Sequence, residues 1–167
     1  MGFIMLLSGC TGIKGENYLE SKPKFDLKSY FTGPIQAWGI VQDRSGNITA
    51  QFDIDMLGTW EGNQGKLVED FRYYDGKTQQ RIWHITALGD GKYEGRADDI
   101  IGTAKGNSFG NAGEWVYTMD LPVGDTTYRL DFNDWMWAMN DGVLMNRSYM
   151  KKFGFKVAEI TIFMKKK

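Results

Sequence analysis

From residue 35 onward, apolar and polar side chains alternate along the chain with a period of two. In NITAQFDIDM, apolar residues from Ile48 to Met56 share one face, and polar residues such as Asp53 share the other. This alternation predicts β-strands with one buried face. Asp-Gly pairs in YDGK and GDGK separate such runs and predict tight hairpin turns. Further strands are predicted at residues 114–121, 126–138, 142–150 and 155–164.

The predicted strands follow one another with short links, and no helix longer than a few residues is expected. One helical turn is predicted at DLKSYF, from Asp26 to Phe31, ahead of the first strand. A meander of about nine or ten strands removes its exposed edges most completely by closing on itself. We therefore predict an all-β fold, a closed antiparallel up-and-down barrel of about 8–10 strands. A sandwich of two sheets is the alternative.

Several strands carry large apolar side chains on both faces. Trp135 and Trp137 share one face of their strand, while Phe132 and Met136 share the other. Only one face can point into a barrel, so the other must meet a helix, a tether, a partner or a membrane.

Composition and charge narrow the class of protein. A chain of 167 residues suits one domain with a sizeable core. Its net charge of −1 argues against a nucleic-acid partner, which requires a basic face.

The first ten residues, MGFIMLLSGC, resemble the end of a bacterial lipoprotein signal peptide. Leu7-Ser8-Gly9-Cys10 is similar to a lipobox, in which the cysteine is lipidated and becomes the mature N-terminus. The apolar run is shorter than such signals usually have, and no Lys or Arg precedes it. Alternatively, Cys10 is a buried free cysteine of an N-terminal strand.

The lipobox interpretation divides the chain into three parts. Residues 1–9 are a partial signal peptide, residues 10–24 are the lipidated cysteine and a polar tether, and residues 25–167 are the barrel. Because Thr11, rather than Asp, follows the cysteine, the resemblance implies a lipid anchor in the outer membrane with the barrel facing the periplasm.

The start of the barrel also resembles a lipocalin, in the run FTGPIQAWG. There a glycine and a tryptophan open the first strand, the tryptophan closes the barrel bottom, and an arginine late in the meander packs across its ring. Gly33, Trp38 and Arg147 are the candidates for these roles, although the glycine-tryptophan spacing differs from the usual one. The resemblance therefore implies that Trp38 and Arg147 close the barrel.

A narrower resemblance covers nearly the whole chain from Lys24. The runs YFTGPIQAWGIVQDRSG, YEGRADDIIGTAKG, LPVGDTTYRLDFNDWMW and GVLMNRSYMKKFGFKVAEITIFM are similar to an uncharacterised family of Gram-negative lipoproteins, a domain of unknown function. This resemblance implies an envelope address and a fold, but no activity.

The residues that could support catalysis are few. His84 is the only histidine, no Gly-x-Ser-x-Gly motif occurs, and no cysteine lies within the barrel, so we expect no metal site and no cofactor. Asp98, Asp99, Asp131 and Asp134 are interpreted as strand-edge charges and turn caps. The sequence favours a non-enzymatic protein without excluding an enzyme.

Arginines that share strand faces with aromatic residues are the best candidates for a ligand site. Barrels that hold fatty acids often place one or two arginines among apolar walls to bind the carboxylate. We therefore predict a carrier or sensor of a lipophilic ligand such as a fatty acid. The alternatives are an isomerase-like, lipid-modifying enzyme that uses a carboxylate or His84 as base, and a filled barrel that binds proteins. The predicted ligand-binding residues are Arg81, Trp83, His84, Arg129, Trp135 and Trp137.

Overall fold

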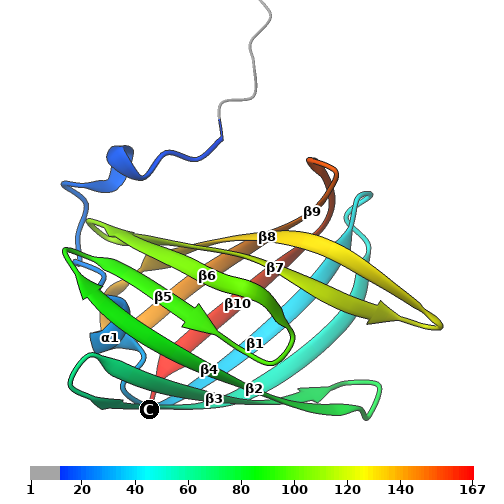
Figure 1. Ribbon diagram of the computed structural model, residues 1–167, viewed down its shortest axis with the longest axis horizontal. Helices are drawn as coiled ribbons and strands as arrows, with labels where there is room; N and C mark the ends of the chain where they lie inside the picture. Colours follow the sequence, from blue (N-terminus) through cyan, green and yellow to red (C-terminus); the bar gives the residue numbers. More distant parts are fainter. Residues whose placement is uncertain (1–11) are drawn as a thin grey trace, which may run out of the picture.

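Ten antiparallel strands form a closed barrel in the computed structural model, which describes residues 12–167 (Figure 1). Each strand pairs with the next, and β1 pairs with β10 to close the sheet. The predicted closed up-and-down barrel is confirmed, and the two-sheet sandwich is excluded. The strands are β1 (Gly33–Asp43), β2 (Ile48–Glu61), β3 (Gln64–Tyr73), β4 (Thr78–Gly89), β5 (Lys92–Arg96), β6 (Ile100–Phe109), β7 (Ala112–Val123), β8 (Thr126–Ala138), β9 (Val143–Lys152) and β10 (Phe155–Lys166).

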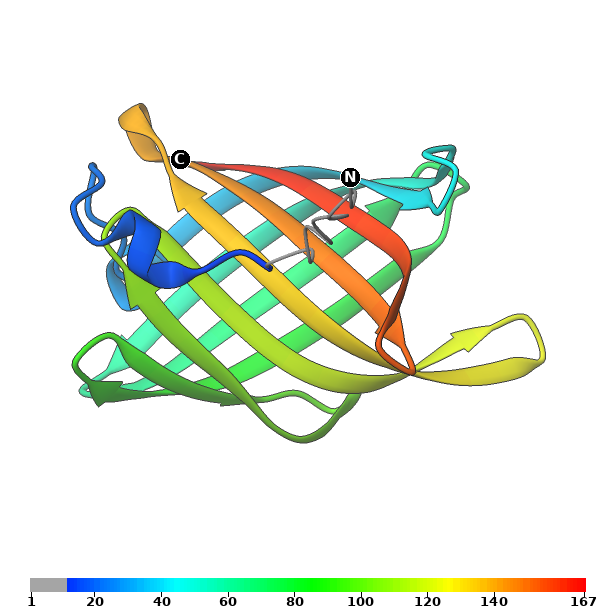
Figure 2. The same ribbon diagram turned by 90° about the horizontal axis from the view of Figure 1, so that it is seen from above.

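The alternation of side chains sets which residues point into the barrel. On β2, Phe52, Ile54 and Met56 are buried inside, as the sequence predicts, while Ile48 is exposed at the end of the strand. Seen from above, the strands cross the barrel axis at a steep tilt, and the β7–β8 hairpin extends beyond its neighbours (Figure 2).

The short helix α1 (Leu27–Tyr30) closes one end of the barrel (Figure 1). Asp26 caps its first turn by accepting a hydrogen bond from the Ser29 amide at 2.7 Å. Leu27 and Phe31 are buried and form the floor of the interior. The predicted helical turn from Asp26 to Phe31 thus serves as the plug.

Polar contacts from the barrel wall hold this plug in place. Trp60 on β2 donates its indole N–H to the Phe31 carbonyl at 2.9 Å, and the Tyr30 hydroxyl donates to the Gly142 carbonyl at 3.1 Å. The Lys166 ammonium on β10 donates to the carbonyls of Ser29, Tyr30 and Thr32 at 3.0, 3.0 and 2.8 Å. The Ser29 and Tyr30 carbonyls belong to the end of the helix and the Thr32 carbonyl lies just beyond it, where a cation is favoured.

Trp38 does not close the barrel, so this prediction is wrong. Its side chain lies on the outer face of β1, 42% exposed, with its ring centre 5.8 Å from that of Phe163 on β10. Its neighbour Gly39 points inward instead, where a Cβ atom would collide with the ring of Phe52. The glycine therefore makes room for Phe52, and the plug is made by α1.

A segment ahead of the plug covers part of the outer wall. The turn η1 (Gly15–Tyr18) packs against β6 and β7, and the Tyr18 ring lies 6.2 and 6.3 Å from the rings of Trp135 and Trp137. The barrel domain therefore begins before residue 25, because part of the segment expected as a tether is docked on it. Cys10 lies outside the described residues.

Candidate functional site

The barrel encloses a cavity of about 240 Å³ above the α1 plug. Its floor and one wall are apolar and are supplied by α1, β1, β2 and β10. Its polar groups come from β3, β4, β7, β8 and β9 instead. The cavity is thus amphipathic, with the polar lining residues Glu69, Tyr73, Gln79, Arg81, Tyr117, Asp134, Asn146 and Ser148.

Glu69, Arg81 and Asp134 form the charged part of this lining, which we call the carboxyl cluster. Glu69 on β3 and Arg81 on β4 are register partners across the ladder. Asp134 on β8 faces Ser148 on β9 and accepts a hydrogen bond from its hydroxyl. These charged residues alternate in phase with apolar neighbours, so the strand pleat directs them inward.

Burial changes the proton affinity of both cluster carboxyls. Loss of hydration raises the pKa of Glu69 to about 7, although the neighbouring Arg81 favours the ionised form. Loss of hydration likewise raises the pKa of Asp134 to about 6, opposed by Ser148 and Arg81. Near neutral pH these two groups can therefore take up or release a proton inside the barrel.

Arg81 itself is tied to the connection between β5 and β6. Its Nε and one terminal nitrogen donate to the same oxygen of Asp99, at 2.9 and 2.6 Å. Burial alone would lower the pKa of Arg81, but Glu69, Tyr117 and Asp99 raise it, so the guanidinium stays charged. Arg81 thus already binds a carboxylate of the protein itself, that of Asp99.

The Arg81–Asp99 pair spans a gap in the barrel wall. Pairing between β4 and β5 ends at His84 and Arg96, so residues 78–83 of β4 extend past the end of β5. Pairing between β5 and β6 likewise begins only at Gly95 and Ala104. The ion pair holds the intervening connection against β4 at this gap.

Of the predicted ligand-binding residues, Arg81 and Trp83 line the cavity. His84 alternates to the outer face of β4 and is exposed. Arg129 also points outward, where its guanidinium binds Asp120 through two hydrogen bonds of 2.9 Å. His84 and Arg129 therefore lie outside the cavity.

Trp135 and Trp137 are also excluded from the interior. Their outer face of β8 is the one that Tyr18 covers, and Phe109 lies 6.2 Å from the Trp135 ring. The prediction took the face with the two tryptophans as the inside. The structure uses the opposite face, with Phe132, Asp134 and Met136.

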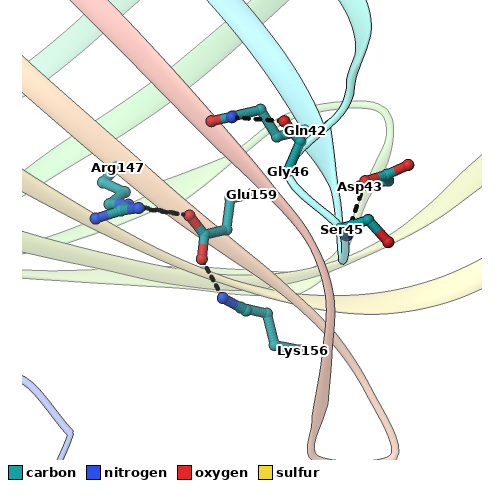
Figure 3. Close-up of polar contacts among 7 residues, drawn as sticks. All are labelled: Gln42, Asp43, Ser45, Gly46, Arg147, Lys156 and Glu159. Atoms are coloured by element: carbon teal, nitrogen blue, oxygen red, sulfur yellow. Dashed lines mark hydrogen bonds and ion pairs between the residues drawn. The ribbon is translucent and has the colours of Figure 1, made fainter.

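Arg147 does not cover Trp38, contrary to the lipocalin-based expectation. It lies on the outer face of β9, where Glu159 accepts hydrogen bonds from its Nε and terminal nitrogen at 3.1 and 2.7 Å. Figure 3 shows Glu159 between Arg147 and Lys156, which also binds this carboxylate. Its guanidinium lies 5.7 Å from the centre of the Tyr149 ring on the same strand.

The sequence analysis did not select Glu69 and interpreted Asp134 as a strand-edge charge or turn cap, although the side-chain pattern of both strands indicates inward carboxyl groups. Glu69 alternates in phase with Leu67 and Phe71, and Asp134 with Phe132 and Met136. A carboxylate on the apolar face of a strand is costly unless it is paired or protonated, and so marks a candidate site.

Residues 12–167 contain no group of three or more His, Cys, Asp or Glu side chains arranged to hold a metal ion. In the same stretch, no helix combines the length and apolar character needed to cross a bilayer.

Comparison with known families places the chain in a family of unknown function. The model of the family described as "Protein of unknown function (DUF3833)" matches residues 4–166. No curated protein matches the chain.

Proposed function

Since the chain belongs to this family of unknown function, DUF3833, its role must be argued from the cavity, and we propose that the barrel binds a lipophilic ligand. One observation carries the proposal: a largely apolar cavity of about 240 Å³ that contains a single buried cluster of ionisable groups. Sites for small molecules commonly combine apolar walls with a few polar groups that fix orientation.

The apolar walls define where the body of the ligand lies. Leu27 and Phe31 form the floor, and Phe52, Ile54 and Ile162 are among the side walls. An alkyl chain or fused ring placed against them gains about 25 cal/mol for each Å² of apolar surface removed from water. The polar end of the ligand then meets the carboxyl cluster.

The charges of the cluster select the chemistry of that polar end. Arg81 already binds Asp99, and Glu69 and Asp134 add two further acids to the same wall. An ionised carboxylate would meet more negative than positive charge there. A hydroxyl, an amide or a protonated carboxyl can instead donate to Glu69 or Asp134, so a fatty acid would bind in its protonated form.

Solvent extraction of the purified protein followed by mass spectrometry tests the proposal. We expect a co-purifying lipophile, and long-chain alcohol added to stripped protein should bind at one site. The variant Ile54→Lys, which places a charge in the apolar wall, should lose this binding, while Asp53→Lys on the outer face of β2 should keep it. A stripped protein that binds neither alcohol nor fatty acid would exclude a lipophile carrier.

The proposal for the cellular address rests on the lipobox. We infer that Cys10 carries a lipid and holds the barrel at the periplasmic side of the outer membrane. Expressed with a complete signal peptide, the Cys10→Ser protein should move from the membrane to the soluble fraction. Membrane retention without lipid on Cys10 would contradict this inference.

A second candidate function is proton transfer on a bound lipid, as in an isomerase. The observation that favours it is the pKa of Glu69, about 7, which suits a general base near neutral pH. His84 cannot take this role from the outer face. Incubation of the lipid with the parent protein and with Glu69→Gln separates the candidates, because a carrier converts the lipid in neither case, whereas an enzyme converts it only when Glu69 is present.

The third candidate, a filled barrel that binds proteins, is less well supported. A cavity of about 240 Å³ leaves room that a packed interior would fill.

A further inference from the structure

The β9–β10 hairpin ends in two aromatic side chains that contribute little to the fold. Phe153 is 88% exposed and Phe155 is 74% exposed. Phe153 lies in the turn between β9 and β10 and Phe155 is the first residue of β10, at the rim opposite α1, which we call the far rim (Figure 1). Neither ring is buried, so packing in the core does not explain why these two positions are aromatic.

The backbone at this turn makes Phe153 more unusual. Its φ is 51° and that of Gly154 is 80°, the left-handed region that favours Gly, Asn or Asp. A bulky side chain is a rare choice there, and here it has almost no packing to offset the strain. A strained, exposed aromatic residue points to a role outside the folded chain.

Basic residues surround the two rings. Lys151 and Lys152 precede the two rings in the sequence and Lys156 follows them, and Lys156 shares the Glu159 carboxylate with Arg147. Lys152 lies 4.3 Å from the centre of the Tyr128 ring on β8 and 5.6 Å from that of Phe153. The tip therefore combines two exposed aromatic rings with Lys151 and Lys152, and Tyr128 of the neighbouring strand β8 lies beside Lys152.

We propose that this tip, Lys151 to Lys156 with Tyr128, inserts into the surface of an anionic lipid bilayer. Aromatic rings favour the interface between water and hydrocarbon, and lysines bind the anionic headgroups above it. The tip is a narrow turn at the end of two strands, a shape suited to insertion between headgroups. This contact is separate from the lipid anchor expected at Cys10.

The tip also has a defined position relative to the cavity. Met150 on β9 and Ile160 on β10 line the cavity and precede and follow the hairpin tip. The α1 plug closes the opposite end. A bilayer bound at the tip would thus face the far rim, although the membrane contact itself does not depend on any cavity ligand.

Vesicle cosedimentation tests the proposal with full-length protein carrying Cys10→Ser, so that no lipid anchor contributes. Vesicles of phosphatidylcholine are compared with vesicles that also contain phosphatidylglycerol. We expect binding to the anionic vesicles that weakens with added salt, and Phe153→Asn combined with Phe155→Thr should weaken it by about tenfold or more. Asn suits a positive φ and Thr suits a strand, so this variant should fold.

Leu88→Ser is the matched control, because Leu88 is 55% exposed on β4 near the α1 end. It should bind vesicles like the parent protein. Equal binding by the double variant, or no vesicle binding by the parent, overturns the proposal. A parent protein that dimerises in solution, with the double variant monomeric and vesicle binding absent, would assign the tip to self-association instead.

Discussion

Glu69 and Arg81 lie directly opposite each other on β3 and β4, and both point into the barrel. A carboxyl group and a guanidinium group are thus neighbours in the buried interior of the barrel. Arg81 nevertheless makes its hydrogen bonds to Asp99, and the pKa of Glu69 rises to about 7. The hydrogen bonds of Arg81 thus go to Asp99 and not to Glu69, and Glu69 can exchange a proton near neutral pH.

Protein stability should fall as the pH rises through the range in which Glu69 ionises. Its pKa is about 7 in the folded protein, against 4.5 for a free side chain, so the folded state binds the proton more tightly. Stability from this group is complete below about pH 4.5 and is lost as the pH rises through about 7, a change of about 3 kcal/mol. Asp134 acts in the same direction up to about pH 6.

Urea denaturation at about pH 5 and pH 8 measures this dependence. Glu69→Gln should reduce the loss of stability between the two values, whereas Asp70→Asn, on the exposed face of β3, should leave it unchanged. If the free energy of unfolding changes equally between the two pH values in Glu69→Gln and in the parent, burial does not raise the pKa of Glu69.

Removal of Arg81 should be far more costly than removal of Arg129. Both guanidinium groups bind an aspartate through two hydrogen bonds, but Arg81 is 16% exposed and Arg129 is 66% exposed. Arg81→Leu leaves buried carboxyls without their cation and should cost about 3–5 kcal/mol. Arg129→Leu should cost much less, because its ion pair with Asp120 is exposed to water. Denaturant midpoints at neutral pH provide the comparison, and similar losses would contradict the buried cluster.

The loss of stability on truncating Leu27 in the α1 plug should exceed the loss on truncating Trp38. Leu27→Ala leaves a hole beneath the cavity and should cost about 2–5 kcal/mol. Trp38→Ala removes a half-exposed ring from the outer wall and should cost about 1 kcal/mol or less. Thermal unfolding of the two variants decides whether α1 or Trp38 closes the barrel. A larger loss for Trp38→Ala would restore the lipocalin-like arrangement.

The architecture could be predicted because period-two patterns and Asp-Gly turns are local features. Even the helical turn from Asp26 to Phe31 was found, although its role as a plug was not. That role depends on contacts with Trp60 and Lys166, which are distant in the sequence.

The inner face of two strands could not be predicted, and this is why the site residues were partly misassigned. On β8 the run FNDWMWA carries apolar groups on both faces, so periodicity alone does not say which face is inside. The N-terminal turn with Tyr18 settles this by covering Trp135 and Trp137 from outside. The same ambiguity on β1 made Trp38 look like an inner residue.

The affinity of a long-chain alcohol, compared with that of the fatty acid of equal length, tests the central claim most directly. Titration calorimetry at about pH 5 and pH 8 gives both constants for the stripped protein. We predict that the alcohol binds at both pH values, and that the fatty acid weakens by about tenfold or more as it and the carboxyl cluster lose their protons. A fatty acid that binds more tightly than the alcohol at about pH 8 would contradict the acidic lining as the site of the polar end.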